Sequence, residues 1–199
     1  MFTGNGSPAA GWPDKSTFLS FDALWNLHES NFNKCPGQTS EETAQLRQAI
    51  LAIDKETGYN DAAGILTQVV QESGGCVRIE STRGQSGQFT NPGLLQSCDG
   101  KHTCAGQAQC PYETIEAMIR DGVAPNEKKS DLVDARQIAG GNHAMTMYRA
   151  ARIYNSGMQS IVPAADGDLW REGMLGIRCY ASDYANIRMG WVGLSCGGQ

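Results

Sequence analysis

Residues 60–75 read NDAAGILTQVVQESGG and predict a helix whose beginning and end are both marked. Asn60 and Asp61 are residue types that commonly cap the start of a helix. The Gly74-Gly75 pair predicts its end, because glycine readily adopts the left-handed conformation that follows a last helical turn. We therefore expect a helix that begins at Asn60 or Asp61 and stops before the two glycines.

Glu72 lies on the apolar face of this helix, three residues after Val69 and seven after Ile65. Partial desolvation and the negative end of the helix both disfavour the ionised carboxylate, so we expect its pKa to be raised towards the range of a general acid. The alternative is a carboxylate in the last turn that is rotated into solvent, as charges near helix ends usually are. Glu72 is therefore the first candidate for a catalytic residue.

Apolar residues recur at helical spacing on both sides of residues 60–75. They are Leu19, Ala23, Leu24 and Leu27, then Leu46, Ile50, Leu51 and Ile53, and the segments 112–120, 132–154 and 181–189. From Cys76 to about Cys110 the chain is instead rich in Gly, Ser, Thr, Asn and Pro, which predicts loops and short strands. We therefore predict an α+β fold, mainly α-helical, with a small loop and β lobe beside a cleft.

Length and composition predict one compact domain. Residues 1–16 are rich in Gly, Pro, Ser and Ala and lack periodicity, so we expect a flexible tail or linker remnant, followed by the domain over residues 17–199.

The 21 acidic and 16 basic residues give a formal charge of −5, which argues against nucleic acid or an anionic membrane as a partner. No apolar run approaches the roughly 18 residues of a membrane span. We expect a monomer that uses no cofactor and no metal.

Seven cysteines in a chain of 199 residues indicate disulfides and an oxidising compartment, so we expect a secreted protein. The expected pairs are Cys104–Cys110, Cys179–Cys196 and Cys35–Cys76, which leave Cys98 unpaired. Other pairings stay open, because spacing alone does not fix connectivity. The cysteines around His102 also have a spacing that could hold zinc, which we consider the weaker alternative.

Three segments resemble, in their order along the chain, the motifs of the goose-type lysozyme and lytic transglycosylase superfamily. They are QESGG at residues 71–75, NPGLLQS at residues 91–97 and RIYNSG at residues 152–157. Two further segments, TIEAMIRDG at 114–122 and CYASDYANIRMGW at 179–191, are similar to a secreted fungal branch of that superfamily. The resemblance covers residues 39–191 and implies a lysozyme-like catalytic domain.

The resemblance implies a role for each matching residue. Glu72 would protonate the glycosidic oxygen, and Tyr154 would reach its carboxylate and orient it. Gln96 would line the cleft and bind a sugar or its acetamido group, with Leu95 standing where the family usually has Met. Two structural interpretations stay open beside these roles, namely that Gln96 satisfies backbone groups in a turn and that Tyr154 is a core aromatic.

The resemblance places other residues beside the substrate with less definite roles. Asn155 would stabilise its segment, and Ser73 is expected to be a hydroxyl at the helix end rather than a catalytic group. A second carboxylate is harder to find, because the family's Asp position holds Cys98 here. Asp99 and Glu80 are the candidates, although both also fit solvated loop acids. The substrate's own acetamido group is the alternative to a second carboxylate.

Together these residues predict a glycoside hydrolase of the muramidase type that cleaves β-1,4 bonds of peptidoglycan, with chitin oligomers as the alternative substrate. We expect hydrolysis rather than release of a 1,6-anhydro end by a lytic transglycosylase. Two further alternatives are an inactive lysozyme-like protein that binds glycans and a small secreted protein whose cysteines serve only stability.

Overall fold

The computed structural model describes residues 1–84, 87–140, 143–161, 167–170 and 176–193. Its α-helices are α1 (Phe21–Phe32), α2 (Ser40–Thr57), α3 (Ala62–Ser73), α4 (Tyr112–Val123), α5 (Leu132–Ala139), α6 (Ala144–Ser156) and α7 (Tyr180–Arg188). Short 3₁₀ helices occupy Pro8–Ala10, Lys15–Thr17 and Met158–Ser160, and the strands are β1 (Thr82–Arg83) and β2 (Thr90–Asn91). The described structure is thus mainly helical with a small antiparallel sheet, which confirms the α+β class in this general form.

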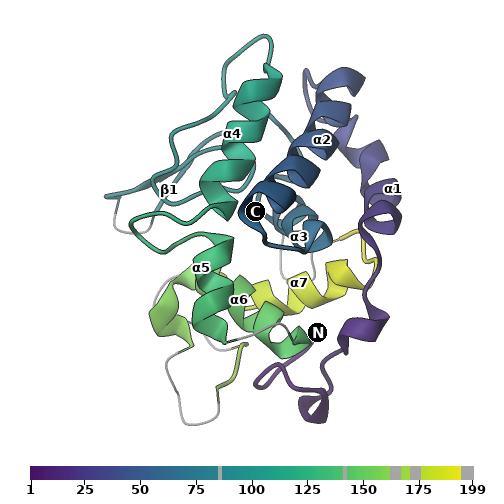
Figure 1. Cartoon of the computed structure of the whole chain (residues 1–199), viewed down its shortest axis with the longest axis vertical. Coiled ribbons are helices and arrows are strands. Elements are labelled where there is room, and N and C mark those ends of the chain that lie inside the picture. Colours follow the sequence, from purple (N-terminus) through teal and green to yellow (C-terminus); the bar gives the residue numbers. More distant parts are fainter. Residues whose placement is uncertain (85–86, 141–142, 162–166, 171–175, 194–199) are drawn as a thin grey trace.

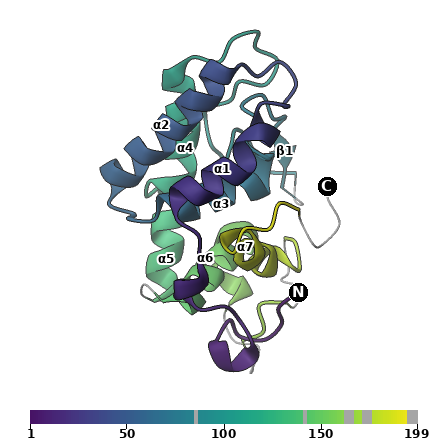
Figure 2. The same ribbon diagram turned by 90° about the vertical axis from the view of Figure 1, so that its right-hand side faces the viewer.

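The helices form an upper and a lower group in Figure 1, with three buried apolar clusters among the described residues. The largest core gathers side chains mainly from α1 to α4 around the middle of α3, where Ile65, Leu66 and Val69 have no exposed surface. The second core lies between α6 and α7, and a small third cluster joins α5 to α6. Turning the molecule by 90° keeps the same division, with α1 to α4 above and α5 to α7 below (Figure 2). Burial of α3 explains why its sequence is apolar on several faces.

The ends of α3 follow the local signals of its sequence. Asp61 is the N-cap, and its Oδ1 accepts a hydrogen bond of 3.1 Å from the backbone N–H of Gly64. Gly74 ends the helix with a left-handed φ of 61°. Gly75 also has a positive φ, and a Cβ at this position would lie 2.2 Å from the ring of Phe32. The two glycines therefore satisfy two different demands, the backbone turn and the close contact with α1.

A buried ionic cluster holds the start of α3 against α5 and α7. The Asp61 carboxylate receives Arg188 from α7 at 2.8 Å and Arg136 from α5 at 3.1 Å. Arg136 also lies over the ring of Tyr59 and donates to the Tyr59 carbonyl. Because the Asp61 and Arg188 side chains are almost fully buried, each charge depends on the other for compensation.

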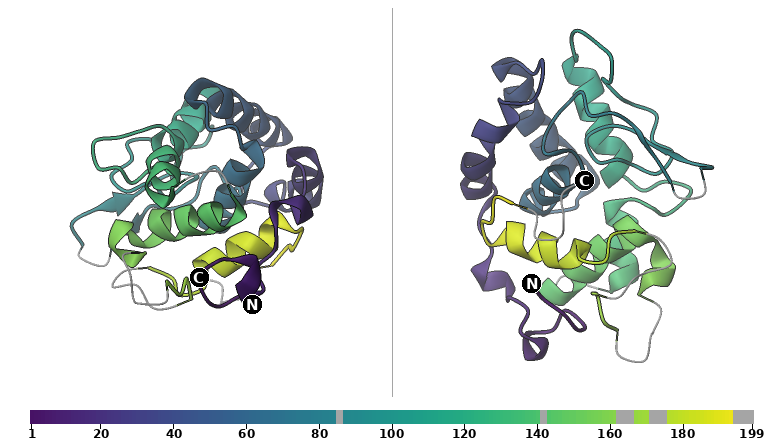
Figure 3. Two further views of the ribbon diagram at one scale, coloured as in Figure 1. Left: turned by 60° about the horizontal axis from the view of Figure 1, so that its bottom comes forward. Right: turned by 180° about the vertical axis from the view of Figure 1, so that it is seen from behind.

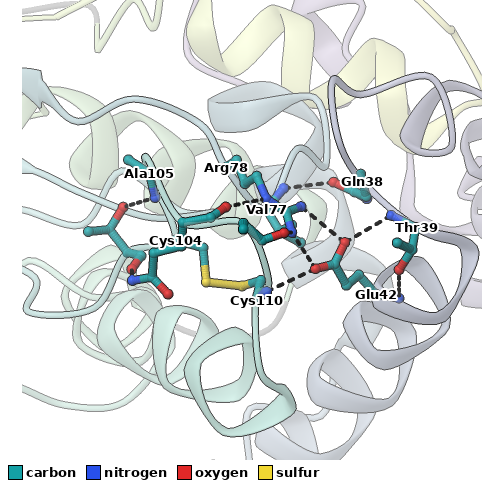
Figure 4. Close-up of a disulfide and its surroundings, with 11 residues drawn as sticks. Gln38, Thr39, Glu42, Val77, Arg78, Cys104, Ala105 and Cys110 are labelled. Atoms are coloured by element: carbon teal, nitrogen blue, oxygen red, sulfur yellow. Dashed lines mark hydrogen bonds and ion pairs between the residues drawn. A yellow bond between two sulfur atoms is a disulfide. The ribbon is translucent and has the colours of Figure 1, made fainter.

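The segment between α3 and α4 forms the predicted lobe of loops and short strands. β1 and β2 pair through Thr82 with Asn91 and Arg83 with Thr90. The Cys104–Cys110 disulfide closes a loop next to Glu42 of α2, whose carboxylate accepts hydrogen bonds from Arg78 and from the backbone N–H of Cys110 (Figure 4). The hydrogen bonds of the Glu42 carboxylate therefore connect the lobe to α2.

The cysteines bear out two of the three expected pairs. Cys35 is bonded to Cys76, and Cys104 to Cys110, whereas Cys98 carries a free thiol. The expected Cys179–Cys196 pair includes a residue outside the described part of the chain. Because Cys104 and Cys110 share a disulfide, they are not thiolate ligands, which removes the zinc interpretation of this cluster.

Residues 1–16 pack on the domain, which differs from the flexible tail expected from composition. Trp12 is 3% exposed and lies between the rings of Phe2 and Tyr148. The backbone N–H of Phe2 donates to the Ser182 hydroxyl at 2.8 Å. Seen from behind, this N-terminal segment lies below α7 (Figure 3). Burial of the two aromatic rings outweighs the entropy that the glycines and polar residues of this segment lose.

Within the described residues, no helix combines the length and the apolar character that crossing a membrane requires.

Candidate active site

Glu72 occupies the last turn of α3, where its side chain is partly exposed. Burial of the carboxyl raises its pKa from about 4.5 to about 7, although a hydrogen bond from Tyr180 acts in the opposite direction. The expectation from the apolar face of the helix is therefore confirmed, and a freely solvated glutamate is not what the structure shows. A carboxyl with this pKa can hold its proton and also release it near neutral pH.

The hydroxyl of Tyr180 donates directly to Oε1 of Glu72. Tyr180 is the first residue of α7 and only 2% exposed. Burial and the nearby Glu72 charge hold the pKa of the tyrosine well above 10, so its hydroxyl stays protonated and remains a donor. Sequence reasoning gave Tyr180 no role, although the residue stands in the CYASDYANIRMGW segment that the resemblance includes.

Tyr154 does not hold the position expected for it. Its hydroxyl donates to the backbone carbonyl of Leu95 at 2.7 Å and not to Glu72. Tyr154 still lies near Glu72. Burial and then the nearby Glu72 charge raise the pKa of Tyr154 well above 10. Tyr180 already donates to the carboxylate, so Tyr154 of α6 instead connects this helix to the loop that follows β2.

Gln96 and Leu95 both contribute to the fold of the loop that follows β2. The Gln96 amide accepts from the backbone and hydroxyl of Thr82, at 3.2 and 2.8 Å, and donates to the carbonyls of Gly93 and Glu80. Gln96 thus fits the structural interpretation, in which its amide satisfies the backbone of a turn. Leu95 is fully buried, so its side chain does not border a substrate.

Ser73 and Asn155 stabilise the local structure around the acid. The Ser73 hydroxyl donates to the Val69 carbonyl at 2.9 Å, as expected of a hydroxyl at a helix end. Asn155 accepts from the backbone N–H of Ile177 at 2.7 Å, which ties the end of α6 to the segment that leads into α7. Asn155 therefore helps to hold the segment that immediately precedes Tyr180.

No second carboxylate contacts Glu72 within the described part of the chain. Asp99 forms an ion pair with Lys128, whose ammonium also lies 4.3 Å from the centre of the Phe89 ring. Glu80 is exposed. A third carboxylate, Asp131, lies near Tyr154, but it has no exposed surface and accepts hydrogen bonds from backbone N–H groups as the N-cap of α5.

A pocket of about 270 Å³ lies between α1, α3 and α7, lined in part by Phe32, Val70 and Ile187. By the helical period, Val70 points to the side of α3 opposite Glu72. The pocket and the acid therefore lie on different faces of α3.

Comparisons of this chain with models of protein families, with curated proteins and with solved structures find no match.

Proposed function

We propose that this protein is a glycan-cleaving enzyme of the lysozyme type, with Glu72 as the general acid. The observation that carries the proposal is the state of Glu72, a desolvated carboxyl at a helix end with a pKa raised to about 7 and a protonated tyrosine on one of its oxygens. Cleavage of a glycosidic bond needs such a group to protonate the leaving oxygen.

The proposed reaction begins with the protonated form of Glu72. Its proton passes to the glycosidic oxygen as the bond from that oxygen to the anomeric carbon breaks, and the carboxylate that remains is stabilised by the Tyr180 hydroxyl. Near pH 6 a carboxyl with a pKa of about 7 is mostly protonated, so the acid is ready before the substrate binds. In this reaction the structure supplies an acid, an oriented donor and a desolvated environment.

The proposed substrate is an N-acetylated amino-sugar polymer, with peptidoglycan first and chitin oligomers second. This choice rests on the resemblance of the QESGG, NPGLLQS and RIYNSG segments to the goose-type lysozyme and lytic transglycosylase superfamily. The two described disulfides fit a protein exposed to an oxidising compartment, and we therefore place the enzyme outside the cell.

Hydrolysis remains the proposed outcome, with water adding to the anomeric carbon and its released proton returning to the Glu72 carboxylate. A second candidate is attack by the 6-hydroxyl of muramic acid, which releases a 1,6-anhydro end. The observation in its favour is that Asp99 is paired with Lys128 and that no carboxylate in the described structure contacts Glu72 to activate a water. Digestion of peptidoglycan in water enriched in oxygen-18 separates the two, because hydrolysis labels the new reducing ends and the anhydro reaction yields unlabelled products lighter by one water.

The proposal is tested by comparing the wild type with Glu72→Gln on bacterial walls, by turbidity, and on chitin oligomers, by product analysis. We expect Glu72→Gln to lose at least about 100-fold in cleavage while retaining its fold and glycan binding. Glu41→Gln is the matched control, because this glutamate is exposed on α2, and it should cleave like the wild type. Full activity of Glu72→Gln would refute the proposal, and glycan binding without cleavage by the wild type would identify an inactive binding protein.

A further inference from the structure

Two adjacent residues at the end of α3 hold the two polar ends of Tyr180. Glu72 accepts from the tyrosine hydroxyl, and the Nε2 of Gln71 donates to the backbone carbonyl of Tyr180 at 2.7 Å. Both contacts join segments more than 100 positions apart in sequence. The tyrosine is thus fixed at its backbone and at its side chain by the same turn of α3.

Other contacts hold the residues on either side of Tyr180. Cys179, the N-cap of α7, is disulfide-bonded, and the Ser182 hydroxyl accepts a hydrogen bond from the backbone N–H of Phe2. Gln71, by contrast, bonds the backbone of Tyr180 itself. A hydrogen bond from a neighbouring helix to the first residue therefore has a direct effect on where Tyr180 lies.

We propose that Gln71 is a positioning residue that fixes the Tyr180 hydroxyl on the Glu72 carboxylate by holding the backbone of Tyr180. The inference rests on the proposed function of Glu72 as the acid. Gln71 acts through the tyrosine and does not touch the substrate. Without the glutamine amide, the backbone of Tyr180 is held less closely to α3 and the hydroxyl spends less time on the carboxylate.

The effect of losing the Gln71 hydrogen bond can be measured as a change in the pKa of Glu72. Among the described residues, the groups that face Glu72 are Tyr180 from α7 and Tyr154 from α6, and beyond Tyr154 lie Asp131 and Cys98. Burial raises the pKa of Glu72 and the Tyr180 hydrogen bond lowers it. Loosening that bond must therefore raise the pKa of Glu72 further.

The experiment follows the Glu72 carboxyl by carbon NMR in protein labelled at glutamate, in the wild type, Gln71→Met, Tyr180→Phe and the double variant. We expect Tyr180→Phe to raise the titration midpoint by about one to two pH units, which is the effect of losing one hydrogen bond to a charged group. Gln71→Met should raise it by less, and the double variant should match Tyr180→Phe alone. Gln48→Met, at an exposed position of α2, is the control and should leave the midpoint unchanged.

A merely structural Gln71 would give a different pattern. An unchanged midpoint in Gln71→Met, or a shift that adds in full to that of Tyr180→Phe, would overturn the inference. If Gln71→Met does not fold, Gln71→Asn gives the same comparison, because its amide is one methylene shorter and no longer reaches the carbonyl. In the active enzyme we expect Gln71→Met to lower kcat and leave KM unchanged. The titration needs no activity, so an inactive wild type would refute the proposed function and still decide the role of Gln71.

Discussion

The hydroxyl of Tyr180 and the carboxylate of Glu72 form a hydrogen bond between residues 108 positions apart, which joins the start of α7 to the end of α3. Arg188, at the other end of α7, reaches Asp61 at the start of α3. The position of the tyrosine on the acid is thus a property of how the two helices pack, fixed by polar contacts at both of their ends.

The first prediction compares the two tyrosines near the acid. Tyr180→Phe removes a donor to the carboxylate, so the pKa of Glu72 rises above about 7 and the basic limb of the kcat/KM profile moves to higher pH. Tyr154→Phe removes a hydrogen bond to the Leu95 carbonyl instead, so the limb stays in place. Glycan cleavage measured from pH 4 to pH 9 checks both. A shift in Tyr154→Phe alone would show that Tyr154 is the orienting residue.

The second prediction concerns the cost of keeping Glu72 desolvated. Its pKa is about 7 in the folded protein against 4.5 for a solvated carboxyl, so the folded state binds more protons between these values and stability falls as the pH rises through them. The difference of about 2.5 corresponds to about 3 kcal/mol. We expect Glu72→Gln to unfold like the wild type at pH 4 and to be more stable by up to about 3 kcal/mol at pH 8, in urea titrations. Equal stability of the two proteins at pH 8 would show that the carboxyl is not desolvated.

The third prediction concerns Glu42, whose contribution to stability should depend on pH with the opposite sign to that of Glu72. Burial alone would raise the pKa of this carboxyl, but hydrogen bonds from Arg78 and from backbone N–H groups outweigh it and lower the pKa to about 2. The resulting stability is present above pH 4.5 and is lost as the pH falls towards 2. We expect Glu42→Gln to cost about 3 kcal/mol at pH 7 and much less at pH 2.5, which is close to the folded-state pKa of about 2, where most of this stability has been lost.

The control for Glu42 is its neighbour Glu41, which is exposed. Glu41→Gln should leave the urea midpoint nearly unchanged at both pH values. If Glu42→Gln lost the same stability at both pH values, the effect would come from packing and not from the charge.

The buried ionic cluster gives the fourth prediction. Asp61→Asn leaves Arg188, which is 3% exposed, and Arg136 without their carboxylate. Removing one partner of such a pair destabilises by about 3–5 kcal/mol, because a buried charge is left uncompensated. Thermal unfolding at pH 7 measures the loss. Asp22→Asn is the comparison, because it breaks the exposed pair with Arg47 and should cost less than about 1 kcal/mol.

The features predicted from the sequence are those with local causes. A cap at Asn60 or Asp61, the glycine stop and the apolar position of Glu72 are set within one helix, and the structure contains all three, with Asp61 as the cap. Tyr180 was not predicted as the donor, because no local pattern reports which residue of α7 meets the end of α3. The role of Gln96 was left between two interpretations for a related reason, since its turn contacts include Thr82, 14 positions away.

The first sixteen residues show the limit of composition as a guide. Glycine, proline and small polar residues outnumber the aromatics there, yet Trp12 is buried in the second core and Phe2 packs against it. The sequence signal for this packing was the presence of two large aromatic rings in the segment. Such rings bury enough surface to order a short chain.

The N-terminal segment also makes the proposed active site sensitive to proteolysis at a point far from Glu72 in sequence. The Phe2 N–H is bonded to Ser182, two residues after Tyr180, so the segment supports the same turn of α7 that carries the donor. A protease that trims the first dozen residues would withdraw that support and would also remove Trp12 from its contact with Tyr148 of α6. In the proposed enzyme, such trimming would therefore lower both the stability of the second core and the activity.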